Sequence, residues 1–116
     1  MTSDRLLSAS TRELLLTPQR LADGSDNPQG YALGWRVSDD KKLFQESVTT
    51  SIFSHHGTGV GSTSYFAVLP EFGLVISVMM NKGQENLEAL TPRATALAEL
   101  FVAEVQRRRV GEPAPR

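Results

Sequence analysis

Cysteine is absent from the 116 residues, so the chain has neither a disulfide framework nor a thiolate site for a metal. A strong charge of either sign is also missing. The formal net charge is −1, which gives no electrostatic reason to expect nucleic acid or a membrane surface as a partner. The longest strongly apolar run, Leu74–Met80, is far shorter than the ~20 residues that a membrane span needs. We therefore expect an ordinary globular chain, without a nucleic-acid partner or a membrane span.

The two ends of the sequence carry little information about structure. The N-terminus lacks the basic start and apolar run of a signal peptide, so the sequence assigns no compartment. At the other end, three arginines followed by GEPAPR predict a disordered tail over residues 107–116. We expect one domain, or part of one, over residues 1–106.

Turn and capping signals divide the N-terminal part of the chain. Ser10 and Glu13 have the spacing of a capping box and predict the start of a short helix. Thr17 ends this helix, because a residue that precedes a proline is excluded from the α region. The glycines, asparagine and proline of residues 22–30 predict a loop.

Three further segments precede the central part of the chain. Alternation of apolar and other side chains predicts a strand over Tyr31–Val37. The charged residues 38–42 then predict a turn. Residues 43–50 fit either a connecting strand or a loop.

The stretch Phe53–Asn81 predicts two strands joined by a turn at Pro70–Gly73. The second strand, Leu74–Met80, is apolar on both faces, which favours a central strand covered on both sides. After it, Thr91 is a good N-cap with a proline at the first helical position. The helix it opens has an apolar stripe with one polar interruption: Leu97, Leu100, Phe101, Glu104 and Val105.

The expected fold is therefore α+β, an antiparallel sheet of about three to five strands flanked by N- and C-terminal helices. Within it, the run His55-His56-Gly57 begins the most polar part of the predicted sheet. Adjacent side chains on a strand point to opposite faces, so these two histidines cannot share one metal ion. We expect no metal site. The alternative to a functional role is a glycine-rich strand entry that lets another segment pack closely.

A nucleotide cofactor is not expected either. The glycines of Gly57–Gly61 are similar to those of a phosphate-binding loop, but the dinucleotide pattern needs a glycine where Ser62 stands. That pattern also needs a helix to follow, whereas the residues that follow here predict a strand. We expect no cofactor of any kind.

Five segments, taken in order, resemble the C-terminal part of the serine β-lactamase family. They are most similar to the class C branch with its D-alanyl-D-alanine carboxypeptidase and esterase relatives. The segments are Gly30–Trp35, His55–Gly57, Tyr65–Pro70, Met80–Lys82 and the helix opened by Thr91-Pro92-Arg93. The resemblance extends roughly over residues 5–106, with Asp39–Thr50 short compared with class C enzymes. It implies the C-terminal part of a β-lactamase/transpeptidase-like fold.

The resemblance also implies roles for five residues. His55 stands where the family has its triad lysine or histidine, which faces the active site and helps to move protons and hold a substrate group. The N–H of Thr58 would be one half of the oxyanion hole. Gly57 would keep the backbone open to substrate, His56 replaces a common threonine, and Asn81 resembles a position that contacts substrate carboxylates. Histidine in place of lysine favours the esterase and peptidase relatives.

The family's nucleophile is the serine of a Ser-x-x-Lys motif on a buried helix upstream. Ser38–Lys41 fits that motif by letter, and Ser25–Asn27 fits the family's Ser-x-Asn, but the first lies in a predicted turn and the second in a predicted loop. We therefore expect the C-terminal fragment of a serine hydrolase that acts by acyl transfer on esters, amides or β-lactams and is inactive alone. Its partner would be a small-molecule or peptide substrate, bound once the missing N-terminal part is supplied.

Two alternatives stay open. The chain could be a non-catalytic binding or assembly module that uses an exposed sheet edge to pair with a partner strand or with itself. It could also be a small α+β domain that is similar to the family in shape alone. Members of the family are often exported, but the sequence itself does not say where this chain acts.

Overall fold

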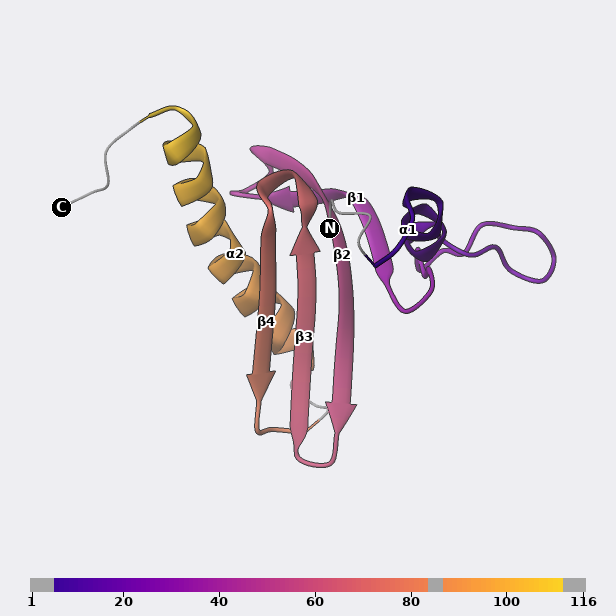
Figure 1. Cartoon of the computed structure of the whole chain (residues 1–116). Coiled ribbons are helices and arrows are strands. Elements are labelled where there is room, and N and C mark those ends of the chain that lie inside the picture. The colour runs from indigo at the N-terminus through magenta and orange to yellow at the C-terminus, as the bar shows by residue number, and fades with distance from the viewer. Residues whose placement is uncertain (1–5, 84–86, 112–116) are drawn as a thin grey trace.

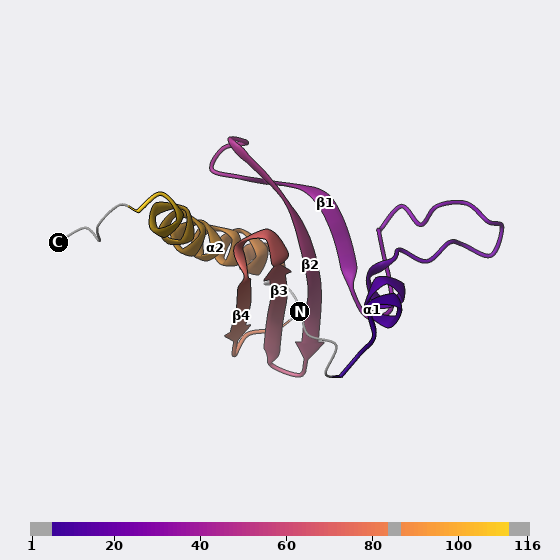
Figure 2. The ribbon, with the colours of Figure 1, turned by 45° about the horizontal axis from the view of Figure 1, so that its top comes forward.

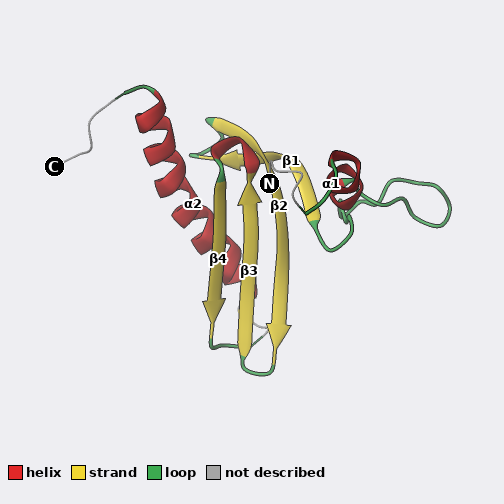
Figure 3. Ribbon diagram, viewed as in Figure 1, coloured by secondary structure: helices red, strands yellow, loops and turns green. Residues whose placement is uncertain are grey.

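A computed structural model of the chain describes residues 6–83 and 87–111, which form one antiparallel sheet with helices (Figures 1 and 3). The strands are β1 (Arg36–Leu43), β2 (Val48–Gly59), β3 (Ser62–Leu69) and β4 (Leu74–Met80), in the sheet order β1-β2-β3-β4. The α-helices are α1 (Ala9–Leu16) and α2 (Leu87–Arg109), with a short 3-10 helix η1 (Pro70–Phe72) between β3 and β4. The α+β class and the antiparallel sheet are thus confirmed.

The stretch Phe53–Asn81 contains three strands rather than the two that were predicted. The histidines and glycines that begin the stretch belong to the end of β2, not to the start of β3. Between them the chain reverses at Val60-Gly61, where Gly61 takes a φ of 72° that favours glycine. This turn was missed because its glycine lies among several others. The second turn, at Pro70–Gly73, is confirmed.

β1 lies later in the sequence than predicted. The predicted turn over residues 38–42 is part of this strand, and of the predicted strand over Tyr31–Val37 only Arg36 and Val37 belong to it. Tyr31 instead forms an isolated bridge to Arg36, because the chain reverses sharply between them. The charged residues of β1 are compatible with a strand since β1 is an edge of the sheet. Residues 43–50, which were ambiguous, contain the end of β1, a turn and the start of β2.

β4 is the other edge of the sheet, so the prediction of a central strand is wrong for the described residues. Its side chains alternate between a buried and an open face. Ile76 is buried against α2, whereas Val75 and Met79 are exposed on the opposite face. The apolar residues on both faces indicated strand structure correctly, but they could not reveal whether both faces are covered.

The start of α1 also differs from the prediction. Its N-cap is Ser8 rather than Ser10, and the Ser8 hydroxyl accepts a hydrogen bond from the Thr11 N–H at 3.2 Å. The cap therefore lies two residues earlier than the capping-box spacing indicates. The predicted end is confirmed, because Thr17 is the extended C-cap before Pro18.

α2 begins at Leu87, so Thr91 is not its N-cap and Pro92 lies inside the helix. The helix also presents a different face from the one predicted. Its buried residues recur every four positions: Leu90, Ala94, Ala98 and Val102. The predicted stripe instead includes exposed residues: Leu97, Leu100 and Phe101 are all exposed, and Leu100 is 70% exposed.

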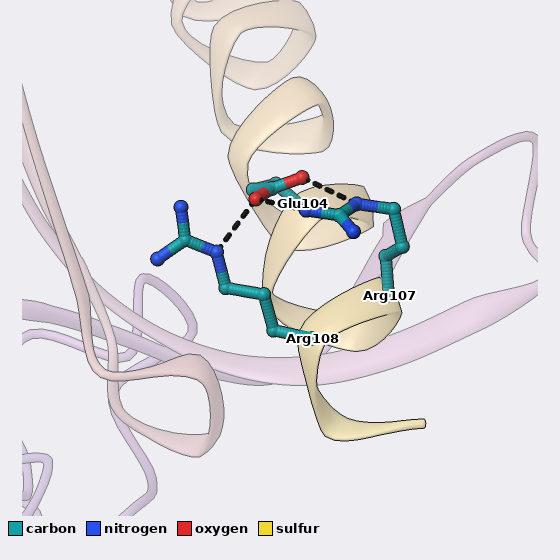
Figure 4. A network of polar contacts seen from close by, with 3 residues as sticks. All are labelled: Glu104, Arg107 and Arg108. Carbon is teal, nitrogen blue, oxygen red and sulfur yellow. Dashed lines mark hydrogen bonds and ion pairs between the residues drawn. The ribbon is translucent and has the colours of Figure 1, made fainter. Parts of the chain in front are cut away.

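α2 extends into the segment that was predicted to be a disordered tail. The predicted tail begins at residue 107, but Arg107 to Arg109 form the last turn of α2. There Arg107 and Arg108 donate hydrogen bonds to Glu104 (Figure 4). Residues 112–116 of the predicted tail lie outside the described residues.

The hydrophobic core lies between α2 and one face of the sheet. Figures 1 and 2 show α2 lying across that face. Its buried members are Leu43, Ile52, Tyr65, Ala67, Leu69, Ile76, Leu90, Ala94, Ala98 and Val102. Within residues 6–83 and 87–111 no helix crosses the opposite face of β2, β3 and β4. The candidate functional residues are divided between this face and the α2 face.

Candidate functional site

The two histidines of β2 lie on opposite faces of the sheet, as their adjacency on a strand predicts. In the register of β2 and β3, His55 is opposite Phe66 and His56 is opposite Tyr65. Tyr65 is buried under α2, whereas Phe66 is exposed on the free face. Residues directly opposite each other share a face, so His55 is on the free face and His56 is on the α2 face.

The imidazole of His55 contacts a tyrosine from a distant part of the chain. Its Nε2 lies 2.8 Å from the hydroxyl of Tyr31, and the two rings meet edge-on with their centroids 6.1 Å apart. The neighbouring surface is aromatic, since the Trp35 ring lies 5.8 Å from the ring of Phe66, the residue opposite His55. His55 is therefore an exposed, oriented imidazole beside an aromatic pair.

His56 is held between the sheet and the helix. Its Nε2 lies 2.8 Å from the hydroxyl of Thr91 in α2, and its ring lies 4.6 Å from that of Tyr65. Burial lowers the pKa of His56, and the positive charges of Arg36 and of a protonated His55 lower it further. His56 thus connects β2 to α2, and its surroundings favour the uncharged imidazole.

Gly57 and Thr58 follow along a stretch of β2 that has one open edge. β1 pairs with β2 only as far as the pair Arg36–Ser54, so from His55 to Gly59 this edge has no partner strand among the described residues. Gly57 shares the face of His55, and a Cβ on it would lie 2.5 Å from the Ser64 hydroxyl. The backbone of this segment is therefore available to an extended ligand.

Asn81 lies at the same end of the sheet, but on another strand. It directly follows β4, and the register leads from Thr58 through Thr63 to Met80. Two strand spacings separate Thr58 from β4, or about 10 Å. The structure thus brings His55, Gly57 and Thr58 together on β2 and leaves Asn81 exposed two strands away.

The serines of the two motif-like sequences do not join this site. Ser38 is opposite Ile52, which is buried under α2, so Ser38 is on the face away from His55. Its hydroxyl donates to Asp40 at 2.7 Å. Ser25 is in the loop before β1, where its hydroxyl donates to Asp23 at 2.6 Å. Neither is placed at the start of a helix under the His55 strand.

Tyr31 is the residue that sequence reasoning missed. Its alternation with Leu33 and Trp35 predicted a strand face, and nothing in that pattern indicated a partner 24 positions later. The signal that could have found it is the pair of glycines at 30 and 34, which both adopt positive φ and allow the chain to reverse after Tyr31.

The described part of the chain contains neither a cluster of metal ligands nor a membrane-spanning helix. No group of three histidine, cysteine, aspartate or glutamate residues there could hold a metal ion. None of the helices over residues 6–83 and 87–111 is long and apolar enough to cross a membrane.

Comparison with known proteins agrees with the resemblance of the sequence segments. The family model described as Beta-lactamase matches residues 2–100, which include the whole sheet and the first part of α2. No match was found among curated proteins or among solved structures. The chain belongs to the beta-lactamase family, whose members include serine hydrolases.

Proposed function

We propose that the chain supplies the sheet side of a serine-hydrolase active site that acts by acyl transfer on ester, amide or β-lactam substrates. One observation carries the proposal. His55, Gly57 and Thr58 lie on the segment of β2 whose edge has no partner strand among the described residues, and His55 is on the face that α2 leaves free. An extended substrate can lie along such an edge and hydrogen-bond to its backbone.

Each residue has a proposed role that follows the resemblance. His55 holds a polar group of the substrate and assists proton movement. The N–H of Thr58 is one donor of the oxyanion hole, and the loss of such a donor lowers the rate by about 10²–10³. Gly57 keeps a side chain away from the substrate, and Asn81 contacts a substrate carboxylate. The side chain of His56 is on the α2 face, so any contact of this residue with substrate is through its backbone.

We propose further that the chain does not hydrolyse substrates by itself and acts as the C-terminal part of the complete site. A serine needs a neighbouring base to attack at neutral pH. Ser38, the serine of the chain's Ser-x-x-Lys sequence, is on the wrong face of the sheet to use His55. The nucleophile would come from a helical region supplied by further polypeptide.

The identity of residue 55 favours esters and peptides over β-lactams. A lysine carries a positive charge at neutral pH, with an ordinary pKa near 10.4, whereas histidine has an ordinary pKa near 6.5. A site with histidine therefore offers a substrate carboxylate less permanent charge. Binding of a substrate through a carboxylate would be correspondingly weaker.

The test is to map where an intact substrate binds. Because the chain alone should leave a cephalosporin uncleaved, its binding can be followed through backbone amide resonances. We expect shifts centred on residues 55–58 that are lost in His55→Ala and kept in Leu100→Ala, a change on the exposed side of α2. Shifts that cluster on α2, or that His55→Ala leaves unaltered, would overturn the proposal.

A second candidate function is assembly through a sheet edge. β4 ends the sheet among the described strands, and its exposed Val75 and Met79 give that edge an apolar face. Such an edge can pair with a partner strand or with a second copy of the chain. Sedimentation at high concentration tests this: a dimer would support it, and a clean monomer would rule out self-pairing.

A further inference from the structure

The hydroxyl of Tyr31 and the imidazole of His55 form a contact for which the resemblance gives no role. It joins two segments that are 24 positions apart, at 2.8 Å between the hydroxyl oxygen and Nε2. The functional role of this contact rests on the proposed function, because His55 can act on a substrate only if its strand faces that substrate. The geometry itself is independent of that function.

Tyr31 is held firmly by its backbone. Its carbonyl accepts a hydrogen bond from the Gln19 N–H at 2.8 Å, and the flanking Gly30 carbonyl accepts one from Val37 at 2.9 Å. At Gly30 the φ is 59°, and a Cβ there would lie 2.5 Å from the Val37 carbonyl oxygen. The tyrosine thus projects from a tightly closed hairpin, so little freedom is lost when its hydroxyl meets His55.

A neutral imidazole has one N–H donor and one acceptor nitrogen, and the partner of one nitrogen decides the state of the other. Among the described residues, Tyr31 is the hydrogen-bond partner of the His55 ring. A phenol hydroxyl is a better donor than acceptor. When it donates to Nε2, the proton of the neutral ring lies on Nδ1, which then faces away from Tyr31 as a donor.

We propose that Tyr31 is a positioning residue that keeps neutral His55 in its Nδ1–H form and so makes it a hydrogen-bond donor to a carboxylate or carbonyl of the substrate. A lysine at position 55 would donate a hydrogen bond by virtue of its positive charge. Here the tyrosine gives an uncharged side chain the same donor character. The hydroxyl can also accept from Nε2–H, so it continues to hold the ring after His55 takes up a proton.

The experiment uses the whole chain labelled with ¹⁵N in its histidine rings. At a pH where His55 is neutral, the two ring nitrogens of the wild-type protein should show Nδ1 protonated and Nε2 unprotonated. In Tyr31→Phe the signals should move toward the mixture of free histidine, in which the Nε2–H form predominates. The His56 signals report on the other face and should keep their wild-type positions.

A wild-type His55 that is already in the Nε2–H form, or whose signals Tyr31→Phe leaves in place, would overturn the inference. The wild-type spectrum alone decides the tautomer, so the result does not depend on the folding of the variant. It is also separate from the binding test. A cephalosporin that fails to shift residues 55–58 counts against the proposed function, whereas the wrong tautomer counts against the role of Tyr31.

Discussion

His55 and His56 are neighbours in sequence, yet their imidazoles bond to residues on opposite faces of one sheet. His55 Nε2 meets Tyr31 and His56 Nε2 meets Thr91, each at 2.8 Å. One histidine therefore belongs to the face that α2 leaves free, and the other connects the same strand to α2. Substitutions at the two positions should consequently have different effects.

His56 should make stability fall as the solution becomes mildly acidic. Burial, with the positive charges of Arg36 and His55, holds the pKa of His56 below its ordinary 6.5. As pH falls, His56 is protonated in the unfolded chain before it is protonated in the folded chain. The contribution of His56 to stability is therefore fully present above pH 6.5 and is lost as pH falls through the lower pKa of the folded chain. Melting temperatures between pH 8 and 5 should decline in wild type and decline less in His56→Gln. Parallel curves for the two proteins would contradict this.

Glu104 should make stability depend on pH in a second, more acidic range. Hydrogen bonds from Arg107 and Arg108 lower the pKa of Glu104 from 4.5 to about 2. Its stabilising effect is thus present above 4.5 and is lost as pH falls from 4.5 to about 2. Glu104→Gln should flatten the loss of helical circular dichroism in that range, and high salt should weaken the effect because Glu104 is only partly buried. An unaltered acid limb in Glu104→Gln would show that this network does not stabilise α2.

The two faces of α2 can be compared by making the same leucine-to-alanine substitution on each face. Leu90 is fully buried against the sheet, and Leu100 is 70% exposed. Leu90→Ala should lower the free energy of unfolding by about 2–5 kcal/mol, because it removes buried contacts and leaves a cavity. Leu100→Ala should change it by no more than ~0.5 kcal/mol. Urea unfolding measures both, and equal losses would mean that the buried face of α2 is assigned wrongly.

Gly30 and Gly34 provide a matched pair for the hairpin that carries Tyr31. Both have positive φ, at 59° and 82°, so alanine at either should cost about 1–2 kcal/mol in backbone strain. At Gly30 alone the new Cβ would also meet a backbone oxygen, whereas open space surrounds Gly34. Gly30→Ala should therefore destabilise the chain more and should alone alter the His55 ring signals. Identical unfolding curves and spectra for the two variants would contradict this account of the hairpin.

The parts of the fold that follow from local chemistry could be predicted from the sequence. Proline excludes helix from the residue before it, so the end of α1 at Thr17 was found. The turn at Pro70–Gly73 and the opposite faces of His55 and His56 followed in the same way. The ordered segments also indicated the family, which the Beta-lactamase family match to residues 2–100 confirms.

The remainder depends on contacts between distant residues. Large apolar side chains indicated the wrong face of α2, because small residues such as Ala94 and Ala98 allow the closest approach to the sheet. The apolar pattern of β4 could not tell a covered face from an open one. The contact of Tyr31 with His55 depends on the chain reversal at Gly34. The alternation of side chains predicted a continuous strand there and gave no sign of the reversal.

We propose that this chain presents the sheet side of a serine-hydrolase site without a nucleophile of its own. The most direct test is the hydrolysis of a chromogenic cephalosporin and of p-nitrophenyl esters by the purified chain, with Ser38→Ala beside it. We expect no turnover above buffer for either protein. Turnover that persists through purification and disappears in Ser38→Ala would contradict it.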